Sequence, residues 1–327
     1  MPQCQANYDG SSPAMEVNAA DILWKRSEAH GMRYTTLLSD GDAKTFNHLV
    51  KTEVYGPDVE LNKEECINHV GKRLGTALRT LVKSSKACGV TLGGKSHGSL
   101  KDVTITKLTN YYHNAISRNK EDVVAMKTAI FATLTHCMST DKKPQHQKCP
   151  IGATSWCFYQ RALANGETPE SHSSNLSTPL SLTTVQAIMP VYQRMASDNL
   201  LERCKGRTQN ANESIHSRVW AKCPKSVFAS RYRVECAVAD TVCEYNNGYI
   251  RSNLDKEAAI GLTPHVNTNK LAIRKDTKRI QLCAKKASVK YAKIRRKIRI
   301  SCMRAEIAQQ RKEGVSYSAG AFDITTD

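Results

Sequence analysis

The chain has 327 residues, of which 40% are hydrophobic and 24% charged, as in a globular protein with a main domain and an inserted one. A formal net charge of +18 favours a polyanionic partner, and no apolar run is long enough to span a bilayer. Nucleic acid suits this charge better than a membrane, because no amphipathic stretch has the Trp, Phe and Leu face of an interfacial helix. The start, MPQCQANYDG, lacks the features of a secretory signal. The twelve cysteines therefore indicate reduced thiols and metal ligands, not a disulfide scaffold.

The first strand–helix unit has a carboxylate at the end of its strand. A β-branched and apolar run at 34–38 predicts a buried strand, which stops at Ser39-Asp40-Gly41-Asp42 before a predicted helix at 44–50. Open α/β sheets have their active sites at the carboxyl ends of strands, so Asp40 is a candidate catalytic residue. An acidic β-turn is the alternative, because Asp-Gly pairs commonly form turns.

The other predicted elements are mostly helices. A helix at 14–30 precedes the strand. A short strand at 59–61 follows it, before a helix at 62–86 that Asn62 and Glu65 would cap. Further helices are predicted at 102–118, 121–137, 184–203, from about 210, at 225–246 and from about 270 to 312. The predicted loops between helices lie at 89–99, 139–158, 168–183 and 261–269.

Cysteine and histidine pairs at metal-ligand spacing occur twice. Cys66-x2-His69 places both side chains on one face of a predicted helix, and His146-x2-Cys149 repeats the spacing in a later loop. Two such pairs predict one tetrahedral Zn²⁺ site, with reserve ligands beside them. The predicted ligands are Cys66, His69, His146 and Cys149, and the reserves are His136 and Cys157. The alternatives are a buried thiol that packs as a small hydrophobic group and a histidine on a helix surface.

A second candidate carboxylate lies much later in the chain. Glu213 follows Asn210 and Asn212, either of which could cap a helix, so Glu213 would lie near the helix start. A glutamate at this position also stabilises the helix dipole, which is the alternative interpretation.

Positive charge is concentrated near the carboxyl end. Residues 270–313 contain sixteen Lys or Arg and three acids, and so contribute +13 of the net +18. Each phosphate that such side chains neutralise releases counterions, which gives salt-sensitive binding without sequence preference. A solvated helix, or a nuclear-import signal in KIRRKIR, is the alternative. The predicted DNA-binding residues are Lys285, Lys286, Lys290, Lys293, Arg295, Arg296, Lys297 and Arg299.

Six longer motifs follow one another over nearly the whole chain. They are YDGSSPAMEV, RYTTLLSDGD, YGPDVELNKEECINHVGKR, STDKKPQHQKCP with SWCFYQRAL, CKGRTQNANESIHSRVWAKCPKSVF, and EGVSYSAGAFD. Unusual segments such as TQNANES beside WAKCPK make this series a more specific indication of a protein family than any single carboxylate is. Together the motifs resemble the Mutator-like transposase domain of animal DNA transposons.

The resemblance implies an RNase H-like fold with an Asp-Asp-Glu triad and a helical insertion before the glutamate. Asp40 of SDGD then matches the second aspartate, and Glu213 of NANES matches the glutamate. Cys66 and His69 match a Cys/Asp-x2-His signature, and Asp42 would be a supporting carboxylate. In such a site, carboxylates from separate elements hold two Mg²⁺ (or Mn²⁺) ions about 3.5–4 Å apart for phosphoryl transfer.

The expected fold class is α/β, with an incomplete RNase H-like core, a large helical insertion and a long basic C-terminal helix. The strand–Asp–helix unit is present, but residues 1–13 are too few and too polar for the three-strand meander that carries the family's first aspartate. We therefore expect impaired cleavage. The predicted segments are 1–61 (partial core), 62–203 (insertion), 204–260 (return to the core with the glutamate helix) and 261–327 (basic helix and tail).

The predicted function is that of a Mutator-like DNA transposase, or of a fragment or domesticated remnant of one. Such a protein binds transposon ends or genomic duplex, and by descent cuts and joins DNA strands with Mg²⁺. The alternative is a non-catalytic DNA-binding protein that uses a zinc-pinned insertion and a basic tail. Either protein is expected in the nucleus, and the resemblance implies a homodimer or larger assembly.

Overall fold

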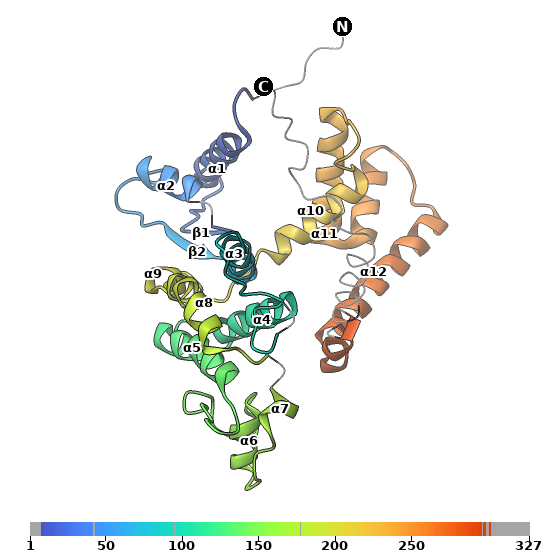
Figure 1. The fold of residues 1–327 in the computed structure, drawn as a ribbon. Helices are drawn as coiled ribbons and strands as arrows, with labels where there is room; N and C mark the ends of the chain where they lie inside the picture. Colours follow the sequence, from blue (N-terminus) through green and yellow to red (C-terminus); the bar gives the residue numbers. More distant parts are fainter. Residues whose placement is uncertain are drawn as a thin grey trace, which may run out of the picture. The chain divides into compact units, whose positions relative to one another are not determined.

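The computed structural model describes residues 8–41, 43–94, 96–176, 178–295, 297, 298 and 301. This described part of the chain is mostly helical and divides into two compact units, Met1–Glu213 and Ser214–Asp327 (Figure 1). None of its helices combines the length and the apolar character needed to cross a membrane.

The first unit contains a small parallel sheet. Strand β1 (Thr36–Ser39) pairs with β2 (Asn62–Glu65), so that the last residues of the two strands lie opposite each other. Helices α1 (Ser12–Glu28) and α2 (Lys44–Lys51) flank β1 in the sequence, and α2 belongs to the crossover that parallel strands require. The predicted strand–Asp–helix unit is therefore confirmed. Two strands do not make an RNase H-like core, which stays a prediction.

Strand β2 occupies residues where the start of a helix was predicted. Its charged side chains, Lys63, Glu64 and Glu65, are buried. Lys63 Nζ lies 3.5 Å from Glu65 Oε1, and Arg207 Nε lies 3.2 Å from Glu64 Oε2. The helix cap predicted at Asn62 and the strand predicted at 59–61 are therefore wrong. The strand instead forms at Asn62–Glu65, because ion pairs allow these charged side chains to be buried.

Five helices form the hydrophobic core of the first unit. They are α3 (Ile67–Ala87), α4 (Asp102–Arg118), α5 (Val123–Met138), α8 (Leu182–Met195) and α9 (Asp198–Glu202). Apolar residues at helical spacing face inward, and Leu74 and Leu78 of α3 are fully buried. The hydroxyl of buried Tyr112 in α4 donates to Met195 O at 2.8 Å, which ties α4 to α8. The short helices α6 (Phe158–Ala164) and α7 (His172–Asn175) follow α5 outside this core (Figure 1).

Helix α10 (Asn210–Lys222) crosses the boundary between the units, and α11 (Arg231–Ala259) and α12 (Val266–Ala287) belong to the second. Gly248 interrupts α11 with a φ of +82°, a conformation that favours glycine. The carboxylate of Asp276 in α12 accepts the backbone N–H of Tyr249 at 3.0 Å, directly after the interruption. This contact joins the two long helices of the second unit.

The predicted basic helix is not continuous. Helix α12 ends at Ala287, and Ser288 has an extended backbone with a ψ of 142°. The Ser288 hydroxyl accepts the backbone N–H of Tyr291 at 3.2 Å and so caps the helical residues that follow. A serine at this position therefore divides the predicted helix into two. The last motif, EGVSYSAGAFD, lies outside the described residues.

Candidate active site

Two carboxylates that lie 173 positions apart in the sequence (213 minus 40) contact one histidine. Asp40 directly follows β1, and its Oδ2 lies 3.6 Å from His69 Nδ1. Glu213, in the first turn of α10, places Oε1 3.3 Å from His69 Nε2. The side chains of Asp40 and Glu213 are 58% and 54% exposed, and that of His69 is 22% exposed. The carboxylates therefore lie on the two nitrogens of one imidazole, open to solvent.

The start of α3 directs His69 toward this site. Cys66 is the N-cap of α3, and its backbone N–H donates to Ser39 O at 3.0 Å, which ties the helix to the end of β1. The Cys66 side chain is buried, and its sulfur accepts the backbone N–H of Gln209 at 3.5 Å. The two residues of the Cys-x2-His motif thus act separately: Cys66 packs inward, and His69 faces the carboxylates.

Hydrogen bonds hold residues 203–210 against the sheet and so return the chain to this site. The backbone N–H of Glu65 in β2 donates to Arg203 O at 2.8 Å. The Gln209 side chain donates from Nε2 to Leu38 O of β1 at 2.9 Å. Because α10 begins directly after these bonds, its first-turn glutamate lies beside the end of β1. The role of Gln209 was not predicted, although it lies in the TQNANES motif.

Gly41 is required for the turn after Asp40. Its φ is +104°, and a Cβ at this position would lie 3.1 Å from Nη1 of Arg73. Arg73 in turn forms an ion pair with Glu65 of β2. A side chain at position 41 would therefore strain the turn and press on this ion pair. Asp42, the predicted supporting carboxylate, lies outside the described residues, and its role stays a prediction.

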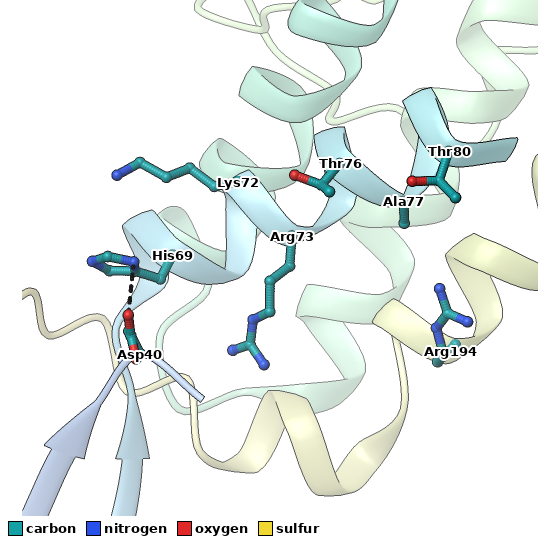
Figure 2. A pocket seen from close by; sticks show the side chains of 8 residues that line it. All are labelled: Asp40, His69, Lys72, Arg73, Thr76, Ala77, Thr80 and Arg194. Atoms are coloured by element: carbon teal, nitrogen blue, oxygen red, sulfur yellow. Dashed lines mark ion pairs between the residues drawn. The ribbon is translucent and has the colours of Figure 1, made fainter. Parts of the chain in front are cut away.

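A positively charged depression of about 530 Å³ extends from Asp40 along α3 (Figure 2). It is lined by Asp40, His69, Lys72, Arg73, Thr76, Ala77, Thr80 and Arg194. Lys72 and Arg73 come from α3, and Arg194 comes from α8 across the depression (Figure 2). Cations and hydroxyls of this kind favour phosphate groups. These cations were not predicted, because lysine and arginine on an exposed helix face have no distinctive spacing.

The thiol of Cys204 lies near the charged residues of the sheet but is not available for chemistry. Burial raises its pKa to about 12, and the negative charge of Glu65 acts in the same direction. At neutral pH this thiol is therefore uncharged. At this end of the sheet, the carboxylates of Asp40 and Glu213 each contact His69 and are exposed, whereas the Glu65 carboxylate is buried and paired with Arg73.

The four predicted zinc ligands do not form one group. Cys66 and His69 lie at the end of the sheet, as described above. The other two predicted ligands belong instead to a buried cluster that includes both reserve residues: His136, His146, Cys149 and Cys157. The ligand atoms of this cluster all lie within 4.8 Å of one another, an arrangement that could hold a metal ion. The predicted set differs because spacing identifies a type of ligand but not its partners.

The predicted DNA-binding side chains lie in the second unit. Those within the described residues are exposed, as a role in binding requires: Lys285, Lys286, Lys290, Lys293, Arg295 and Lys297. Arg296 and Arg299 lie outside the described residues.

A family model matches the first part of the chain. Residues 1–157 match the model described as Mutator-like transposase. The matched range contains Asp40, the Cys66-x2-His69 pair and the buried Cys/His cluster, and it ends before Glu213. No curated protein and no solved structure matches the chain.

Proposed function

We propose, from the match of residues 1–157 to the Mutator-like transposase model, that the protein is a Mutator-like transposase that binds DNA and cuts or joins its strands at a divalent-metal site. Asp40 and Glu213 would provide the metal ligands. The observation that carries the proposal is the contact of both carboxylates with His69. Both carboxylates are more than half exposed, so their oxygens remain accessible to a cation and to a substrate.

The residues present suit Mg²⁺ or Mn²⁺. Both ions prefer oxygen ligands, and the half-exposed carboxylates of Asp40 and Glu213 leave room for water and substrate. When bound, such ions activate a water or hydroxyl nucleophile and stabilise the leaving oxygen. His69 contacts both carboxylates and so keeps Asp40 and Glu213 on one side of the sheet edge, where they would share an ion.

The depression beside Asp40 would receive the DNA backbone. Lys72, Arg73 and Arg194 supply positive charge there, and the depression includes Asp40, one of the two carboxylates that would act on the phosphodiester (Figure 2). Arg73 has a planar fork of donors that suits phosphate oxygens, although Glu65 shares it. The proposed path places a phosphate next to Asp40.

A second candidate function is non-catalytic DNA binding in the nucleus. It is favoured by the exposed lysines and arginines after α12 and by the buried Cys/His cluster, which would pin the insertion with zinc. We propose a nuclear location for either protein, since its substrate is DNA. We also propose a homodimer, as the resemblance to transposases implies.

Nicking of supercoiled plasmid distinguishes the two functions. With Mn²⁺ or Mg²⁺, the chain should nick DNA slowly, in line with the impaired cleavage expected from the sequence, and Asp40→Asn or Glu213→Gln should slow this nicking further, at least about a hundredfold. Metal stabilisation is worth several kcal/mol, and about 1.4 kcal/mol is tenfold in rate. Glu202→Gln, at an exposed carboxylate of α9, is the matched control and should keep full activity.

Two outcomes would contradict the catalytic proposal. In the first, both carboxylate variants nick as fast as the control. In the second, the unchanged chain binds duplex DNA but does not nick it with either metal, which would favour the second candidate.

A further inference from the structure

A quartet of nitrogen and sulfur ligands is buried between α5 and α6. His136 lies in the last turn of α5, His146 and Cys149 lie in the loop that follows, and Cys157 caps the start of α6. All four side chains are buried, with at most 6% of any residue exposed. Their ligand atoms come together within 4.8 Å. Buried polar groups of this kind require partners, and a shared metal ion would satisfy all four at once.

Four of the six distances between these atoms lie close to the edges of a tetrahedron around zinc. His136 Nδ1 lies 3.2 Å from His146 Nδ1, and Cys157 Sγ lies 3.4 Å from His146 Nδ1. Cys149 Sγ lies 3.7 Å and 3.8 Å from the same two nitrogens. With Zn–N of about 2.0–2.1 Å and Zn–S of about 2.3 Å, tetrahedral ligand atoms lie about 3.3–3.8 Å apart.

A chain of polar groups behind His146 fixes which of its nitrogens faces the quartet. His146 Nε2 lies 2.9 Å from Ser139 Oγ, which lies 2.9 Å from His172 Nε2. His172 Nδ1 lies 2.6 Å from Asp141 Oδ1. His146 Nε2 also lies 2.9 Å from His172 Nε2. In one arrangement of protons that fits these contacts, His172 Nδ1–H donates to Asp141, Ser139 Oγ–H donates to His172 Nε2, and His146 Nε2–H donates to Ser139 Oγ.

This assignment leaves Nδ1 of His146 without a proton, facing the quartet. Metal-bound histidines commonly donate their second nitrogen to such a partner, which orients the ring. Hydrogen bonds from His172 lower the pKa of Asp141 to about 2, so the carboxylate at the end of the chain is ionised.

The segment around the quartet has little else to stabilise it. Between Met138 and Leu180, no described residue belongs to the hydrophobic core of the first unit. The structure of this segment consists of α6, α7 and irregular loop, and the ring of Tyr159 stacks on His146 while that of Phe158 meets it edge-on. A segment without a core needs another source of stability, and a structural metal commonly provides it.

We propose that His136, His146, Cys149 and Cys157 bind one structural Zn²⁺, with Asp141 and His172 as positioning residues. Two sulfurs and two imidazoles in a tetrahedron select zinc over Mg²⁺ or Ca²⁺. Four protein ligands close the site, which leaves no position for substrate and makes the ion structural. The site replaces the predicted set that contained Cys66 and His69. Because it does not use DNA, it can be tested separately from the proposed function.

Metal analysis of the full chain, purified with zinc present, tests this proposal. We expect about one zinc per chain, lost in Cys157→Ser and kept in the matched controls Cys66→Ser and Cys137→Ser, which alter other buried thiols. A second variant, Cys149→His, keeps four metal ligands and so tests the site even if Cys157→Ser does not fold. Its cobalt derivative should bind one ion with about half the sulfur-to-cobalt absorption, since one of two thiolates remains.

Either of two results would overturn the zinc proposal. One is a folded full chain without zinc. The other is zinc whose binding does not depend on the quartet, seen either as zinc that requires Cys66 but not Cys157 or as a cobalt spectrum that Cys149→His leaves unchanged.

Discussion

Removal of zinc should open residues 139–179 to protease by more than about a hundredfold while the helical core stays closed. Structural zinc contributes about 10–16 kcal/mol in small domains, and a loss of about 3 kcal/mol already gives a hundredfold change. Since protease cuts the open form, cleavage should rise with the open population. Trypsin can report this, because Lys142 and Lys148 are exposed on either side of His146.

The measurement compares tryptic cleavage rates at each site before and after a zinc-selective chelator is added in excess Mg²⁺. Cleavage at Lys142 and Lys148 should accelerate, and added zinc should restore protection. Lys83 and Lys86, near the end of α3, serve as internal references whose rates should not change. Equal rates at Lys142 and Lys148 with and without zinc would show that no metal holds this segment.

Affinity for duplex DNA should fall about 10⁴-fold between 50 and 200 mM salt. If the eight basic side chains predicted at 285–299 each neutralise one phosphate, the logarithmic slope is about −7. Their exposure within the described residues is consistent with this role. Fluorescence anisotropy with a labelled duplex over this salt range would measure the slope.

Charge-neutral variants identify the source of that slope. Replacement of all eight lysines and arginines at 285–299 with glutamine should make the slope much shallower. A variant that exchanges lysine for arginine, and arginine for lysine, keeps the charge and should keep the slope. An unchanged slope in the glutamine variant would assign the phosphate contacts to another surface, such as the depression beside Asp40.

The helical spacing of apolar residues predicted the core helices correctly, because the apolar residues of such a helix are the ones that become buried. Helix α4 covers the predicted 102–118, and α5 (Val123–Met138) departs from the predicted 121–137 by two residues or fewer. Strand β2 was missed because Lys63, Glu64 and Glu65 are typical of exposed positions. Their ion pairs form only in the folded chain, since one partner, Arg207, is more than a hundred residues away.

The candidate sites could be predicted only in part. Glu213 was connected with Asp40 through the family resemblance, since no spacing rule links residues so far apart. The sequence spacing identified His and Cys as metal ligands. Which of them share one ion depended on how loop 139–158 packs beside His136, and spacing does not show this. His172 was missed entirely, because a single histidine in a Ser-rich linker has no motif around it. Local patterns therefore predict elements and ligand types, whereas partners depend on tertiary contacts.

Iron-mediated cleavage of the polypeptide tests most directly whether Asp40 and Glu213 hold the same cation. The zinc-loaded chain would be incubated with Fe²⁺ in place of Mg²⁺, then with ascorbate and peroxide, and the fragments mapped. We predict two cuts, one beside Asp40 and one beside Glu213, both suppressed by Mg²⁺ and both lost in Glu213→Gln. A cut beside Asp40 that persists in Glu213→Gln would show that the two carboxylates do not share an ion.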